Sequence, residues 1–163
     1  DFTQSLENKT GQVQQQTRGV VYIQKPGKFR WQVKSPNQQL FVSDGKVLWH
    51  YEIDLAQVTK QPLRNSIADA PLLLLTGKDQ QLSKLFSIKT LSKDSYDLQP
   101  KDPSAGVKQI IVKFAGAKPV SLKIVNGLGQ VTLIKLSKVD LNAKFATSLF
   151  RFVPPRGVDV LGK

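Results

Sequence analysis

Residues 40–52 read LFVSDGKVLWHYE, and this stretch decides the fold class. Two runs rich in β-branched and aromatic residues flank Asp44-Gly45, a dipeptide suited to the positive φ angles of a tight turn. The stretch therefore predicts a β-hairpin. In its second run Trp49 and Tyr51 alternate with His50, so if the two rings face the interior, His50 faces water.

The same alternation recurs on both sides of this hairpin. In the run FRWQV, residues 29–33, the apolar Phe29, Trp31 and Val33 share one face. KIVNGLGQVTLI, residues 123–134, predicts a second hairpin. Short strands joined by hairpins predict one largely antiparallel sheet, and about ten strands in one domain curl strongly or close into a barrel.

One stretch, NSIADAPLLLLTGKDQQLSKLF at 65–86, breaks the strand pattern. Pro71 is suited to open a helix and Gly77 to end one, so we expect two short helices at 66–76 and 79–85. A single sheet with one apolar face needs a cover, and this stretch is the candidate lid. The lid residues that we expect to cover the sheet form one run of leucines: Leu72, Leu73, Leu74 and Leu75.

Composition narrows the function classes. The 163 residues suffice for a single domain spanning 1–163, and 24 Lys and Arg against 12 Asp and Glu give a net charge of +12. Such a charge favours anionic partners, namely nucleic acid, phospholipid head groups or acidic proteins, without choosing among them. The absence of cysteine excludes disulfides, thiolate catalysis and cysteine zinc sites.

Catalysis and metal binding have little support in the residues. His50 is the only histidine, so it has no second imidazole or thiolate to share a metal, and no GxSxG turn accompanies it. The carboxylates Asp44, Glu52, Asp54 and Asp69 are scattered over turns and strand ends. We therefore expect no catalytic residue, no metal, no cofactor and no enzyme activity. The lysines are also spread over many strands, and no aromatic RNA-binding motif is present.

The apolar face of the sheet is the remaining candidate site. The residues that we expect to line one concave surface are Val21, Ile23, Phe29, Trp31, Val33, Val47, Trp49, Tyr51, Phe150 and Phe152. A dry core and a cavity for an apolar ligand require the same residues, so the pattern alone leaves both interpretations open.

Two strings carry a resemblance to a known family. The run from Lys25 to Thr59 contains a basic residue and Pro26, then Phe29 and Trp31, and then VSDGKVLWHY. The ending FRFVPPRGVDVL, 150–161, has a Phe-x-Phe strand followed by Pro-Pro-x-Gly-Val. In this order they resemble the periplasmic outer-membrane lipoprotein carrier family, LolA, over nearly the whole chain.

The resemblance implies a mainly β fold of the α+β class: an unclosed, strongly curved antiparallel β-barrel with short helices as a lid over a hydrophobic cavity. It also implies a function in the periplasm of a Gram-negative bacterium. Such a carrier accepts triacylated lipoproteins from an inner-membrane ABC transporter, shields their acyl chains and delivers them to an outer-membrane receptor. It uses no cofactor and is expected to be a soluble monomer that binds no nucleic acid.

The chain also departs from the family pattern. Members begin with an amphipathic helix, whereas this chain starts at a strand-like DFTQSLENKTG, so that helix is expected to be missing here. The family's lid-holding Arg corresponds to Lys25, which offers a point charge without a planar fork. By the same resemblance, Pro26 and Phe29 are candidates for docking to the transporter.

Two other functions are compatible with the residues. One is a domain on the same fold that senses lipid or lipopeptide. The other is a basic binder of single-stranded nucleic acid, whose affinity would fall steeply with salt.

Overall fold

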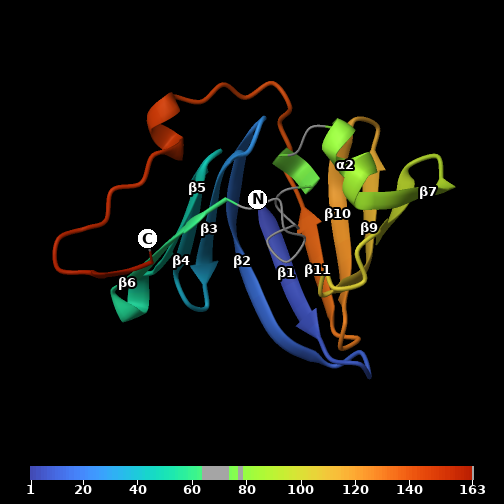
Figure 1. Cartoon of the computed structure of the whole chain (residues 1–163), viewed down its shortest axis with the longest axis horizontal. Coiled ribbons are helices and arrows are strands. Elements are labelled where there is room, and N and C mark those ends of the chain that lie inside the picture. The colour runs from blue at the N-terminus through green and yellow to red at the C-terminus, as the bar shows by residue number, and fades with distance from the viewer. Residues whose placement is uncertain (64–73, 77–78, 163) are drawn as a thin grey trace.

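The computed structural model describes residues 1–63, 74–76 and 79–162 and contains one strongly curved sheet (Figure 1). Its twelve strands in chain order are β1 (Phe2–Glu7), β2 (Val13–Gln24), β3 (Lys28–Ser35), β4 (Gln39–Asp44), β5 (Val47–Glu52), β6 (Gln57–Pro62), β7 (Phe86–Ser92), β8 (Ser95–Pro100), β9 (Val107–Ala115), β10 (Lys118–Asn126), β11 (Val131–Leu136) and β12 (Asp159–Leu161).

The spatial order of the strands is β12-β6-β5-β4-β3-β2-β1-β11-β10-β9-β8-β7. All neighbours are antiparallel except β12 and β6. In the described part of the chain the end strands β12 and β7 are not neighbours, so the barrel is open. This confirms the predicted unclosed, mainly β fold, although with twelve strands where about ten were expected.

Both predicted hairpins are present. In the first, β4 and β5 flank Asp44-Gly45, and Gly45 has a φ of 96°, a left-handed value that favours glycine at this turn. The Asp44 carboxylate accepts hydrogen bonds from the backbone amides of Lys46 and Val47, and these two bonds also stabilise the turn. In the second, β10 ends at Asn126 and β11 begins at Val131.

The described helices agree with the predicted lid as far as they extend. Helix α2 spans Asp79–Leu85, as the sequence predicted. Of the helix predicted at 66–76, residues 74–76 are helical, and Leu72 and Leu73 lie outside the described residues. Two short 3-10 turns that the sequence did not predict are η1 (Ile53–Leu55) and η3 (Thr147–Phe150). Among the described residues, no helix has the length and apolar character needed to cross a membrane.

The main core fills the concave side of the sheet, which we call the inner face. Its buried members come from both halves of the curve: Phe2, Phe29, Trp31, Val33, Leu48, Phe86, Leu98, Ile110, Val112, Leu122, Ile124 and Ile134. Phe2 stacks on Trp31 with ring centroids 3.9 Å apart. Gly19 stands opposite Phe2 in the register, and a Cβ there would come within 2.9 Å of the Phe2 ring and would also collide with the Gln32 carbonyl of β3.

A second apolar cluster lies on the opposite, outer face of β3 to β6. Its buried members are Leu40, Val42, Val58 and Phe150. The C-terminal segment covers them: η3 contacts β3 and β4, and the Arg30 guanidinium donates to the Leu149 carbonyl at 3.5 Å. In Figure 1 this segment, in orange and red, crosses the upper end of the molecule and descends outside β5 before pairing as β12.

Candidate functional site

The strand register divides the ten expected cavity residues between the two faces. Val21, Ile23, Phe29, Trp31 and Val33 lie on the inner face, where Phe29 is 2% and Trp31 5% exposed. The other five do not. In β5 the inner-face position belongs to Leu48, so its neighbours on the opposite parity point outwards. The outward-facing five are Val47, Trp49 and Tyr51 together with Phe150 and Phe152 of the C-terminal segment.

Ring contacts confirm this correction. Phe152 packs against Trp49 and Tyr51 with centroid distances of 5.5 and 5.9 Å. Lys60 places its ammonium 5.5 Å from the Trp49 ring centroid. The expectation of one common surface was wrong for these residues because β5 carries apolar side chains on both faces, and large rings do not indicate which face is inside.

A cavity of about 530 Å³ with a wall that is more apolar than polar opens at the end of the barrel where the helices lie. The apolar side chains around it come from β2, from residues 74–75, from α2, from the β9–β10 hairpin, from the end of β11 and from the segment after it: Val21, Ile23, Leu74, Leu75, Leu82, Phe114, Pro119, Leu136, Val139, Leu141 and Phe145. The polar and charged residues that also line it are Asp1, Tyr22, Lys25, Ser137, Lys138 and Asp140. This cavity is the candidate functional site, because a concave apolar surface next to the core suits an apolar ligand.

The lid residues that the structure describes occupy the inner side of this cavity. Leu74 and Leu75 are half-buried and pack against the main core, and so do Leu82 and Leu85 of α2. Leu82 and Leu85 were not among the expected lid residues, although their spacing of three places them on one helix face. In this conformation, leucines of the lid therefore fill space that faces the sheet.

The turn between β2 and β3 is bonded to the lid. The Gly27 amide donates to the Thr76 carbonyl at 3.1 Å, and Thr76 is fully buried. Lys25, the residue expected to hold the lid, lines the cavity and is exposed. Pro26 is also exposed. Of the two expected docking residues, only Pro26 presents its side chain at the surface, because the Phe29 ring is in the core.

His50 occupies the inner face, contrary to the expectation that it faces water. It stands opposite Phe41 in the register and stacks on that ring at 4.1 Å and 7°. Its Nε2 is buried without a hydrogen-bond partner in the described part of the chain. Burial lowers the pKa of His50 because the charged imidazolium would lose its water, and the Glu52 carboxylate opposes this shift. No three His, Asp or Glu side chains gather to hold a metal within the described ranges.

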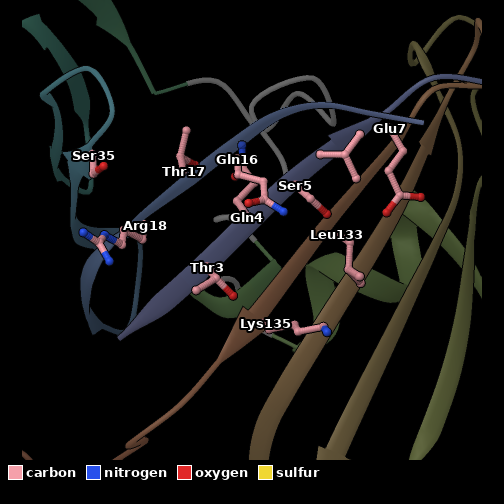
Figure 2. A pocket seen from close by; sticks show the side chains of 11 residues that line it. Thr3, Gln4, Ser5, Glu7, Gln16, Thr17, Arg18, Ser35, Leu133 and Lys135 are labelled. Carbon is pink, nitrogen blue, oxygen red and sulfur yellow. The ribbon is translucent and has the colours of Figure 1, made fainter. Parts of the chain in front are cut away.

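A second hollow, of about 620 Å³, lies over β1, β2 and β11 and is shown in Figure 2. Thr3 pairs with Lys135 and Arg18 across the ladder, at positions whose parity is opposite to that of the core residue Phe2. Most of the lining is hydroxyl, amide or charged, including Gln4, Ser5, Glu7, Gln16 and Thr17. Covering such groups with hydrocarbon costs free energy, so this hollow does not suit an acyl chain.

Known proteins provide an independent comparison. Residues 1–153 match the family described as "Outer membrane lipoprotein carrier protein LolA". The chain is 34% identical over 164 residues to the outer-membrane lipoprotein carrier protein of Legionella pneumophila (strain Corby), covering 99% of this chain and 81% of the relative. It is 36% identical over 166 residues to the protein of the same name from Bordetella avium (strain 197N), covering 99% and 78%.

Proposed function

The chain belongs to the LolA family of outer-membrane lipoprotein carrier proteins and is a lipoprotein carrier, and from this premise we propose how its fold performs that task. The carrier works in the periplasm and holds the acyl chains of triacylated lipoproteins in the apolar cavity between the sheet and the lid. It receives them from an inner-membrane ABC transporter and passes them to an outer-membrane receptor. It makes and breaks no covalent bond.

The observation that carries this proposal is the composition of the cavity wall. Val21 and Ile23 on the sheet face Leu74 and Leu75 on the lid, and all four pack against the main core. A hydrocarbon chain that enters this cavity is removed from water, and each buried CH₂ group contributes about 0.8 kcal/mol of favourable binding free energy. Three long chains held at that value alone would dissociate too slowly for a carrier.

The lid lowers the net free energy of acyl-chain binding and so allows release. When the cavity is empty, Leu74, Leu75 and Leu82 bury their own side chains against the sheet. Acyl chains must displace these leucines, so the free energy of burying the lid offsets much of the free energy of binding. The bond between the Gly27 amide and the Thr76 carbonyl breaks in the same movement, because Thr76 is part of the lid. Transfer then proceeds to a receptor with a more favourable apolar site and needs no nucleotide at the carrier.

Tryptophan fluorescence tests this function. Trp31 pairs with the cavity residue Val21, whereas Trp49 lies on the outer face, so a Trp49→Phe variant reports on the inner face alone. Titration with a triacylated lipopeptide should give a saturable change in Trp31 emission that is nearly independent of salt, because apolar burial involves no counterion release.

The matched control is the same peptide without acyl chains, which should leave the Trp31 emission unchanged. A complementary variant, Trp31→Phe, should show little response from Trp49. Binding of the deacylated peptide with equal affinity would contradict the proposal, and so would affinity for an oligonucleotide that falls steeply with salt.

A further inference from the structure

We propose that β7 is a docking strand for the polypeptide part of the cargo: an extended, acidic segment that follows the acylated residue pairs with the free edge of β7 as an additional strand. This inference rests on the proposed function, because the acyl chains must first be in the cavity. It extends recognition from the lipid to the protein that carries it.

The first observation is that β7 ends the sheet. Among the strands that the structure describes, β7 has β8 as its only neighbour, and Figure 1 shows it at the margin of the molecule beyond β9. Every β7 residue after Phe86 is exposed. An edge of this kind presents unpaired amides and carbonyls, which an extended peptide can bond by strand addition.

The pairing with β8 shows which backbone groups are free. The Lys101 amide donates to the Leu85 carbonyl at 2.9 Å, so Leu85 and Lys101 form a hydrogen-bonded pair. Antiparallel ladders alternate bonded and non-bonded pairs, so the next pair, Phe86 with Pro100, is non-bonded, which fits proline's missing amide. By the same alternation, Ile88 and Thr90 direct their backbone groups away from β8.

The C-terminal end of the strand lies where the cargo would emerge. The β7–β8 turn is joined to the cavity wall, because the Phe114 amide donates to the Asp94 carbonyl at 2.8 Å and Phe114 lines the cavity. Tyr96, opposite Thr90 in the register, packs edge-on against the Phe114 ring at 5.9 Å. A chain that leaves the cavity beside Phe114 therefore meets the end of β7.

Side chains along the edge indicate what kind of segment fits. Ile88 and Leu91 are 48% and 50% exposed and offer apolar contacts. The exposed charges around the strand are mainly positive: Lys84, Lys89, Lys93 and Lys101, against the exposed acids Asp94 and Asp102. The Asp97 carboxyl group, opposite Lys89 in the register, is buried. This balance favours an acidic segment. It disfavours a second copy of the chain, because two β7 strands would bring Lys89 of each copy together on molecules that each carry +12.

The test compares two triacylated lipopeptides on the full-length carrier by calorimetry. One ends shortly after the acylated residue, and the other continues with an acidic, extended segment as long as β7. The longer lipopeptide should bind about tenfold more tightly, as two or three modest backbone hydrogen bonds would give after ordering costs. Ile88→Pro removes an amide that no bond within the sheet uses, so it should reduce the longer lipopeptide to the affinity of the shorter one.

Two controls separate the edge from the fold. Ile88→Val retains the amide and should retain the tenfold difference. Because a proline variant can fail to fold, the same question is asked with peptides: N-methylation on one edge of the added segment should abolish the difference, and N-methylation of the opposite edge should preserve it.

The outcomes are distinguishable. If the shorter lipopeptide binds and the longer one binds no more tightly, the edge proposal is wrong and the carrier function stands. If neither binds, both are wrong. A dimer of the wild-type carrier that Ile88→Pro converts to a monomer would overturn the proposal in favour of self-pairing.

Discussion

At the scale of single residues, His50 and Asp97 are the two described side chains that have a buried polar atom without a hydrogen-bond partner, and His50 is the one inside the barrel next to an aromatic ring. It stacks on Phe41 inside the barrel, and its Nε2 is buried with no hydrogen-bond partner among the described residues. The other groups that face it are Thr59, opposite on β6, and Glu52, which follows on the same face of β5. A neutral ring is tolerated in this position, but an imidazolium would be poorly solvated.

His50 therefore makes stability depend on pH. Its pKa in the folded chain lies below the ordinary 6.5, so the unfolded chain takes up the proton first as the pH falls. This contribution to stability is complete above pH 6.5 and is lost as the pH falls from there through the folded-state pKa. His50→Phe retains the stacked ring and removes the titration, so its free energy of unfolding should fall less than that of the wild type between about pH 8 and about pH 5.

Urea unfolding at both pH values measures this effect. Carboxylates titrate in both proteins, so their contributions cancel when the two pH dependences are subtracted. Identical pH dependences would mean that His50 gains enough water or charge in the folded state to titrate normally.

At the scale of elements, the β2–β3 turn connects the sheet to the lid. Gly27 has a φ of 70° and donates to Thr76, and a Cβ on Gly27 would lie 3.1 Å from the Cα of Gly45 in the neighbouring hairpin. The two glycine turns thus pack against each other below residues 74–76. A side chain at this contact would force the two turns apart.

Gly27→Ala should be destabilising for two reasons that a control can separate. A left-handed backbone costs an alanine about 1–2 kcal/mol, and the contact with Gly45 should add about 1 kcal/mol or more. Gly116 has a φ of 61° and would place its Cβ in open space, so Gly116→Ala should show only the first cost. Urea unfolding measures both, and equal losses would mean that the packed turns move apart easily.

The elements also show how far the sequence predicts this fold. Turn chemistry predicted both hairpins, because Asp44-Gly45 and the residues after Asn126 favour few other conformations. Alternation predicted that Phe29 and Trp31 share a face but failed in β5, where Leu48 lies inside and Trp49 outside. The outer face of β5 is apolar because the C-terminal segment covers it, and that long-range contact has no local signal. The same contact places Phe150 and Phe152 on the outer face, and without a signal for it in the sequence both residues were expected in the cavity.

At the scale of the whole molecule, the sheet separates two apolar layers. The inner layer meets the lid and the cavity, and the outer layer, which includes Val42 and Val58, lies under the C-terminal segment. A backbone ladder lies between them. Phe150 also packs edge-on against the cavity residue Phe145 at 6.0 Å, so only the part of the outer layer away from that contact acts on the inner layer through the sheet alone. Stability and ligand binding should therefore be separable by mutation.

Leu40→Ala tests this separation. Leu40 is 8% exposed in the outer layer, away from the residues that line the cavity, and removing a buried leucine side chain typically costs about 2–5 kcal/mol. Urea unfolding should show a free energy of unfolding that is lower by roughly this amount. At low temperature, where the variant remains folded, it should still bind a triacylated lipopeptide with wild-type affinity. Leu82→Ala should show the reverse pattern, with a smaller loss of stability because Leu82 is only half-buried. It should also bind the lipopeptide more tightly, because a smaller lid side chain is displaced at lower cost. A folded Leu40→Ala protein with weakened lipopeptide binding would show that the outer layer shapes the cavity through the sheet.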